Sequence, residues 1–91
     1  MIFEWDEPKN RVNIRKHGVS FETASRIFDR PILTRHDHRK DYGEARCVSI
    51  GELENGALIV VAHTERAGRT RLISARPASR KERQAYHEKA R

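Results

Sequence analysis

The chain has few of the residues that build several common protein classes. Cys47 is the single cysteine among 91 residues, so no disulfide can form within the chain, which suits a reducing cytoplasm. No apolar run is long enough to span a bilayer, and the opening MIFEWDEPKN lacks the pattern of a signal peptide. The five glycines include no glycine-rich phosphate loop. We therefore expect a soluble cytoplasmic protein that makes no contact with a membrane.

Positive charge is what the sequence has in excess. Nineteen lysines and arginines stand against thirteen acidic residues, which gives a formal net charge of +6 and a pI near 10.1. Much of the excess lies between Arg76 and Arg91, where six basic residues accompany two glutamates. Such an excess predicts a polyanionic partner, either nucleic acid or an acidic protein surface. The simpler alternative is a basic tail that only improves solubility.

The local signals predict a single domain over residues 1–91, with no linker and no second domain. A helix that starts after Asp6 should end before Gly18, and a second helix should follow from Ser20, with the last helix opened by the capping box of Ser79 and Glu82. The expected order is β-α-α-β-β-β-β-α: strand 2–5, helices 6–17 and 19–30, strands 31–37, 44–53, 57–65 and 70–76, and helix 78–91. This order predicts an α+β fold, an antiparallel sheet with the helices packed on one face.

The turn RAGR at residues 66–69 predicts the register of the last two strands. Glu65 should pair with Thr70, His63 with Leu72, and Val61 with Ser74, because antiparallel pairing runs outward from a hairpin turn. Side chains alternate between the two faces of a strand. The predicted register therefore places His63, Glu65 and Arg76 on the same face of the hairpin.

Three arginines on this hairpin, Arg66, Arg71 and Arg76, are candidates for a phosphate site. A guanidinium is permanently charged and binds phosphate oxygens in a planar, bidentate manner, and a rigid strand positions it more accurately than a loop does. Such a group would stabilise the charge that develops when a phosphodiester is cleaved. The alternative is that these arginines form ordinary surface ion pairs, with Glu52, Glu54 or Glu65 as partners.

Histidines are the candidates for proton transfer, because imidazole titrates close to neutral pH. His63 is favoured by its predicted position beside Glu65. His17 is the second candidate, although it and Lys16 also suit the negative end of a helix dipole. The HDH segment at residues 36–38 has the spacing of two ligands but lacks a convincing third, so neither a metal nor another cofactor is expected.

Several ordered motifs resemble one family. The segments FEWDEPKNRVNIRKHGVSFETA, IGELENGALIVVAHTER and RLISARPASRKERQAYHE resemble the BrnT family, the toxin component of BrnT/BrnA type II toxin–antitoxin pairs. The resemblance implies a fold similar to RelE-like ribonuclease toxins, RNA cleavage that inhibits translation, and no metal requirement. The positions implied by the KHG, TER and SAR motifs are Lys16, His17, Glu65, Arg66 and Arg76.

The reasoning from the residues and the family resemblance together give the full set of expected site residues and partners. His63 joins these five positions as a catalytic candidate, and the expected RNA-binding residues are Lys9, Arg71, Arg80 and Lys81. The resemblance also implies a BrnA-like ribbon-helix-helix antitoxin, assembly as a dimer or as a heterotetramer with that antitoxin, and DNA binding only through the complex. The alternative is a non-catalytic basic module that binds nucleic acid or an acidic protein. The general acid and base, the RNA sequence preference and the antitoxin-binding surface stay open.

Overall fold

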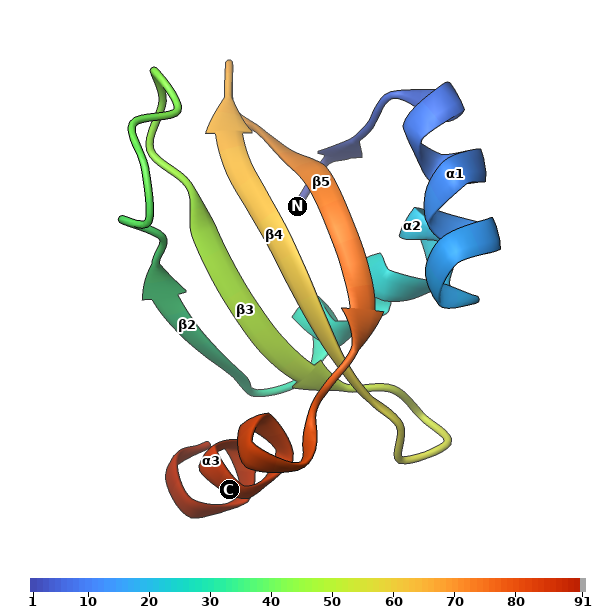
Figure 1. The fold of residues 1–91 in the computed structure, drawn as a ribbon, viewed down its shortest axis with the longest axis vertical. Coiled ribbons are helices and arrows are strands. Elements are labelled where there is room, and N and C mark those ends of the chain that lie inside the picture. Colours follow the sequence, from blue (N-terminus) through green and yellow to red (C-terminus); the bar gives the residue numbers. More distant parts are fainter. Residues whose placement is uncertain (91) are drawn as a thin grey trace.

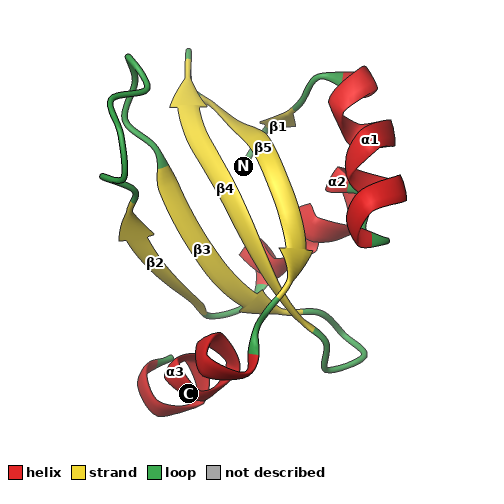
Figure 2. Ribbon diagram, in the orientation of Figure 1, coloured by secondary structure: helices red, strands yellow, loops and turns green. Residues whose placement is uncertain are grey.

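The computed structural model describes residues 1–90 and contains one five-stranded sheet with helices around it (Figure 1, Figure 2). The elements follow the expected order, with the second helix divided in two. Their bounds are β1 Phe3–Glu4, α1 Glu7–His17, α2 Phe21–Ala24, η1 Ser25–Asp29, β2 Ile32–His36, β3 Cys47–Glu52, β4 Leu58–Arg66, β5 Arg69–Pro77 and α3 Arg80–Lys89. Within residues 1–90, no helix combines the length and the apolar character that a membrane crossing needs.

The predicted helix ends are confirmed in most cases. Gly18 adopts the left-handed conformation with φ of 73° and ends α1, as a C′ glycine commonly does. The Ser20 hydroxyl accepts the Thr23 N–H at the start of α2, and Ser79 forms the complete capping box with Glu82 at the start of α3. The second helix is shorter than predicted, because its last turns from Ser25 onward are the 3₁₀-helix η1.

The sheet is mixed, which corrects the prediction of an antiparallel sheet by one parallel pair of strands. Its strand order is β1-β5-β4-β3-β2. The pairs from β2 to β5 are antiparallel, whereas β1 runs parallel to β5, with Phe3 beside Thr70 and Glu4 beside Arg71. The chain can return in parallel here because the long path through α1 and the other strands separates β1 from β5.

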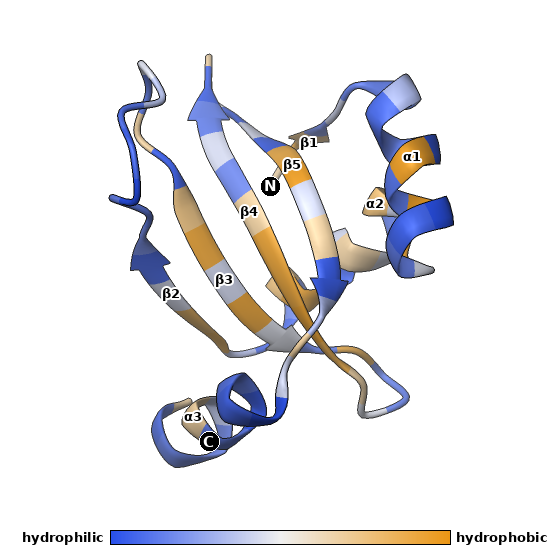
Figure 3. Ribbon diagram, in the orientation of Figure 1, coloured by the Kyte–Doolittle hydropathy of each residue, from blue (hydrophilic) through white to orange (hydrophobic). Residues whose placement is uncertain are grey.

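Helices cover both faces of the sheet, so the prediction of helices on one face is wrong. Alternate residues of β4 belong to two separate cores, with Ile59 and Val61 on one side and Leu58 and Val60 on the other. The first core contains Phe21, Ala24 and Ile27 of α2 and η1, and the second contains Tyr86 of α3. Figure 3 shows the continuous apolar stretch along β4 that causes this arrangement. A strand that is apolar on both sides needs cover on both sides.

Helix α1 lies along the outer edge of β5 and is attached there by an asparagine. The Asn13 amide donates to the Ala75 carbonyl at 2.7 Å, and its oxygen accepts the Ala75 N–H at 3.2 Å. The same amide also donates to the Val19 carbonyl at 2.9 Å. Asn13 therefore supplies hydrogen-bond partners to the N–H and C=O groups of Ala75 on the edge of β5, beyond the short strand β1, as a neighbouring strand would. Val12 and Ile14, the aliphatic residues of α1, are 51% and 42% exposed, so this helix buries little apolar surface.

The β4–β5 hairpin has the predicted turn but not the predicted register throughout. Ala67 and Gly68 both have positive φ, which is the requirement of a two-residue turn of type I′. Pairing of Glu65 with Thr70 and of His63 with Leu72 is confirmed. A bulge follows, so that Val61 pairs with Ala75 and not with Ser74. Ile73 is the extra residue, and every β5 side chain beyond it lies on the face opposite to the predicted one.

Candidate functional site

The bulge brings three arginines to one face of the hairpin. Arg66 follows Thr64 by two residues, and Arg71 is the cross-strand partner of Thr64. Arg76 pairs with Val60, which lies in the core beneath α3. Because paired residues of an antiparallel ladder share a face, all three arginines lie on the face that α3 partly covers. We call this surface the arginine face and define it by Arg66, Arg71 and Arg76.

Each arginine of this face is held by a glutamate from a different segment. Arg66 donates to Glu44 at 2.8 Å, and Arg71 donates to Glu4 of β1 at 2.9 Å. Arg76 forms two hydrogen bonds of 2.7 and 2.8 Å with Glu82 of α3. These are the carboxylate partners that the alternative interpretation required, although the glutamates differ from the expected Glu52, Glu54 and Glu65. The arginines are thus fixed in place while their side chains stay partly exposed, by 53% for Arg66, 28% for Arg71 and 42% for Arg76.

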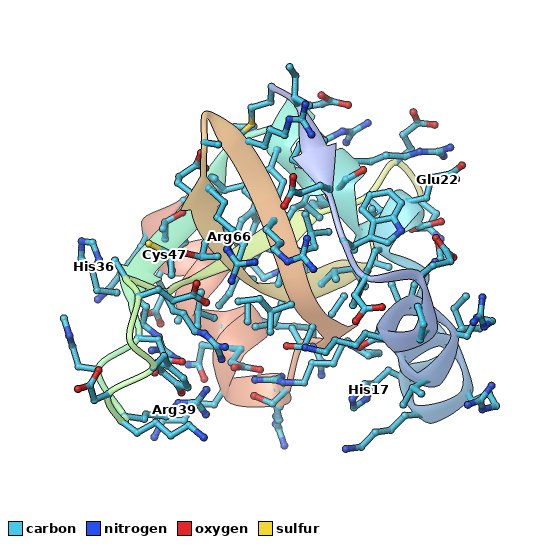
Figure 4. The ribbon with its side chains drawn as sticks, turned by 90° about the horizontal axis from the view of Figure 1, so that it is seen from above. His17, Glu22, His36, Arg39, Cys47 and Arg66 are labelled. Atoms are coloured by element: carbon cyan, nitrogen blue, oxygen red, sulfur yellow. The ribbon has the colours of Figure 1, made fainter. Side chains whose placement is uncertain are left out.

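Three segments border the arginine face. Helix α3 lies across its lower end, the segment 37–46 lies beside β3 and β4, and α1 lies beyond β5 (Figure 1). Figure 4 shows Arg66 at the hairpin, Arg39 on the loop segment and His17 at the end of α1. The hydrogen bonds to Glu82 raise the pKa of Arg76, and the positive charge of Arg39 opposes this to a smaller extent. Cations from strand, loop and helix therefore surround one surface.

The two remaining hairpin candidates, His63 and Glu65, lie on the other face. The predicted co-facial arrangement of His63, Glu65 and Arg76 is wrong, because the bulge reverses the β5 side chains after Leu72. His63 is 8% exposed, packs in a T-shaped arrangement with the Phe28 ring and shares a 2.7 Å hydrogen bond with the buried Ser49 hydroxyl. Burial lowers the pKa of His63, and the neighbouring charge of Glu65 raises it to a smaller extent. Its environment is that of a neutral core histidine.

The candidates from α1 lie together in a groove beside β5. Lys9, Lys16 and His17 line this groove of about 330 Å³, opposite Ile73 and Ser74 of β5. Ser74 points to the same face as Arg76, since the two are separated by one residue after the bulge. The α1 cations thus flank the arginine face, which the residue spacing alone did not predict. Arg80 is exposed at the first turn of α3, and Lys81 lines a second groove between α3 and the sheet.

Segment 37–46 is more ordered than the exposed loop that its polar residues 38–43 indicate, and it extends into residues expected at the ends of the two flanking strands. Asp37 is buried and accepts two hydrogen bonds of 2.9 Å from the Arg39 guanidinium and one of 3.1 Å from the Tyr42 hydroxyl. The bonds from Arg39 hold the pKa of Asp37 well below its usual range. Arg46 stacks over the Tyr42 ring at 4.0 Å and approaches Glu44 at 3.4 Å. The aspartate within a run of cations was the available signal of this arrangement.

The histidines of this segment do not form a larger cluster of metal-binding groups. The rings of His36 and His38 lie 5.7 Å apart, and the Cys47 sulfur lies 3.7 Å from Nδ1 of His36. Within the described part of the chain, no set of three or more His, Cys, Asp or Glu side chains is arranged to hold a metal ion.

Comparison with known proteins places the chain among toxins. The family model described as "Ribonuclease toxin, BrnT, of type II toxin-antitoxin system" matches residues 5–82. The structure is similar to the crystal structure of the Brucella abortus ribonuclease toxin BrnT, with a TM-score of 0.66 and 29% sequence identity. That alignment covers 88% of this chain and 100% of the Brucella chain. No match was found among curated proteins.

Proposed function

Since the chain belongs to the BrnT family, the ribonuclease toxins of type II toxin–antitoxin systems, we propose that it cleaves RNA on the arginine face. The activity is that of a metal-independent endoribonuclease, and its consequence in the cell is inhibition of translation. The observation that carries this proposal is that Arg66, Arg71 and Arg76 lie along one face of the hairpin with partly exposed side chains.

The ion pairs of the arginine face are compatible with phosphate binding. An exposed ion pair contributes little to stability, because water screens it and two side chains lose freedom in forming it. A phosphate of RNA can therefore replace a glutamate at modest cost and accept the same planar pair of N–H donors. Until it does, the glutamates keep the arginines in extended, ordered positions. The surface is thereby preorganised for an anion.

The proposed reaction is an attack of the RNA 2′-hydroxyl oxygen on the adjacent phosphorus. The bond from phosphorus to the 5′-oxygen of the next nucleotide breaks, which leaves a 2′,3′-cyclic phosphate and a 5′-hydroxyl end. Arg76 holds the non-bridging oxygens as charge builds on them, with Lys16 in support. Arg66 and Arg71 lie nearer the hairpin turn, because Arg76 pairs with Val60, six residues before Arg66, which corresponds to about 20 Å along a strand. They bind neighbouring phosphates of the same RNA strand. The leaving oxygen takes a proton from solvent.

Proton transfer from the 2′-hydroxyl is assigned to His17. This imidazole lines the groove beside the arginine face together with Lys16, and a general base must be within reach of the proton it removes. His63 and Glu65, the other candidates, lie on the opposite face, and His63 is also buried. Lys9 and Arg80 extend the cationic border on which a longer RNA strand would rest.

A cognate antitoxin completes the proposed system. The family is defined by a toxin–antitoxin pair, and we expect the partner to be a BrnA-like ribbon-helix-helix protein. DNA binding belongs to the complex and not to this chain alone. The toxin is expected in the cytoplasm, where both RNA and the antitoxin are available.

Incubation of the purified protein with RNA in the presence of EDTA tests the proposal. We expect cleavage of RNA, 2′,3′-cyclic phosphate ends, and no cleavage of an all-deoxy strand of the same sequence. The rival function, a non-catalytic basic module, predicts salt-sensitive binding without cleavage. Intact RNA after incubation with folded protein would therefore reject the enzyme and favour the module.

A further inference from the structure

Beside the arginine face, on the same side of the sheet, an apolar floor meets a positively charged rim. A groove of about 490 Å³ lies between α3 and the part of the sheet formed by β2 and β3. Its floor consists of aliphatic side chains, namely Leu33, Val48, Ile50 and Ala85. Arg35 of β2 stands on one side of the groove, and Lys81 and Lys89 of α3 stand on the other. We call this surface the α3–β2 groove.

The rim cations differ from those of the arginine face in having no carboxylate partner. Arg35, Lys81 and Lys89 form no ion pair with any residue between positions 1 and 90. The one carboxylate in the groove, Glu82, is already bound by Arg76 through two hydrogen bonds. The rim therefore presents positive charge that nothing in the described chain neutralises.

The combination of floor and rim selects the class of partner. A nucleic acid backbone would engage the cations but would leave the aliphatic floor without a matching surface. An amphipathic helix matches both features, because its apolar stripe fills a groove while acidic residues on its flanks face the rim. The groove also opens over the face of the sheet, so an occupant would extend the layer that α3 begins.

We infer that the α3–β2 groove is the docking site for an acidic amphipathic helix of the antitoxin. This inference rests on the proposed function only in taking the partner to be the antitoxin. The groove lies on the same face of the sheet as the arginine face, toward β2, and the Glu82 carboxylate joins the two through Arg76. Docking here places the partner against the helix that holds one of the phosphate-binding arginines.

Isothermal titration calorimetry with the purified full-length cognate antitoxin tests the inference. The test variant is Arg35→Glu/Lys89→Glu, which reverses charge on both sides of the groove and leaves the proposed RNA-contacting residues unchanged. The matched control is Arg11→Glu/Arg15→Glu, which makes the same change at two exposed positions of α1. We expect the groove variant to bind the antitoxin at least tenfold more weakly and the control to change by less than twofold.

Several outcomes would overturn the inference. Equal antitoxin affinity of the wild type and the groove variant would do so, as would failure of the folded wild type to bind the antitoxin. If the groove variant loses affinity for RNA but keeps its affinity for the antitoxin, the groove binds nucleic acid. If the wild type sediments as a dimer without antitoxin and the groove variant as a monomer, the groove binds a second copy of this chain. If thermal melting shows the charge-reversed variant to be unfolded, Arg35→Gln/Lys89→Gln replaces it, with several-fold weaker binding expected. Since calorimetry needs no catalysis, the result is independent of whether RNA is cleaved.

Discussion

The Arg76 guanidinium binds both oxygens of the Glu82 carboxylate, at 2.7 and 2.8 Å, and so connects the end of β5 to the first turn of α3. Glu82 also accepts the Ser79 N–H at 2.8 Å and completes the capping box. One carboxylate therefore fixes an arginine of the proposed RNA-binding surface, starts the last helix, and lines the α3–β2 groove.

The attachment of α3 should weaken in acid. The hydrogen bonds from Arg76 lower the pKa of Glu82 to about 2, below its usual value of 4.5. The stabilising contribution of a group with a lowered pKa is complete above the unfolded value and is lost as the pH falls through the folded value. We expect Glu82→Gln to melt several degrees below the wild type at pH 6. The difference should shrink between pH 4.5 and pH 2 in thermal scans.

The exposed Glu88 of the same helix provides the control for this experiment. Glu88→Gln should melt close to the wild type at each pH. A constant difference between Glu82→Gln and the wild type from pH 6 to pH 2 would show that the ionised pair does not hold α3.

Asn13 should be a large contributor to stability although it is polar. Asn13→Ala removes the partners of both backbone groups of Ala75 at the edge of β5, and leaving buried backbone groups unpaired costs about 1–3 kcal/mol. We expect the free energy of unfolding in urea to fall by that amount. The exposed neighbour Arg15 is the control, since Arg15→Ala should change it by less than about 0.5 kcal/mol. An equal, small effect of both substitutions would contradict the role of Asn13 as an edge partner.

Glu44 should compete with RNA for Arg66. Glu44 accepts from Arg66 at 2.8 Å and lies 3.4 Å from Arg46, and the bond from Arg66 lowers the pKa of Glu44. Glu44→Gln removes the competing charge, so we expect RNA to bind about threefold more tightly at moderate salt. Fluorescence anisotropy with a labelled, cleavage-resistant strand measures this. Weaker binding of the variant would mean that Glu44 supports the RNA site instead of opposing it.

Substitution of His17 should affect RNA cleavage, whereas substitution of His63 should affect stability. His17→Gln is expected to reduce the cleavage rate by about 10²–10⁴-fold, which is the range for loss of a general base. His63→Gln should keep the rate within about threefold and lower the stability, because His63 is buried against Phe28 and Ser49. Single-turnover rates and thermal melts of both variants provide the comparison. The reverse pattern would place the active surface on the other side of the sheet.

Local signals were sufficient to predict the elements. The spacing of Phe21, Ala24, Ile27 and Phe28 predicts one apolar stripe on a helix; the first three are fully buried and Phe28 is partly buried. Gly18, Ser20 and the capping box at Ser79 end or begin helices as expected. These features depend on neighbours within one or two turns, which the residue order contains directly.

The site was harder to predict, because its geometry depends on a β-bulge of one extra residue in β5. Ile73 has no distinguishing signal, yet it moves Arg76 from the side of His63 to the side of Arg66 and Arg71. The glutamate partners come from residues distant in the chain, such as Glu4 with Arg71, and spacing does not reveal such pairs. The uninterrupted apolar run of β4 did indicate that the second face of the sheet is also covered. Its consequence for α3 became clear only in the structure.

Cleavage of RNA by an arginine-depleted protein is the most direct test of the central claim, that the arginine face binds the phosphate undergoing cleavage. We propose measuring single-turnover cleavage in EDTA for the wild type, for Arg66→Ala/Arg71→Ala/Arg76→Ala, and for the exposed control Arg11→Ala/Arg15→Ala, with folding of each checked by thermal melting. Our account predicts at least a hundredfold loss of rate in the triple variant and less than a twofold change in the control. A folded triple variant that cleaves RNA as fast as the wild type would contradict it.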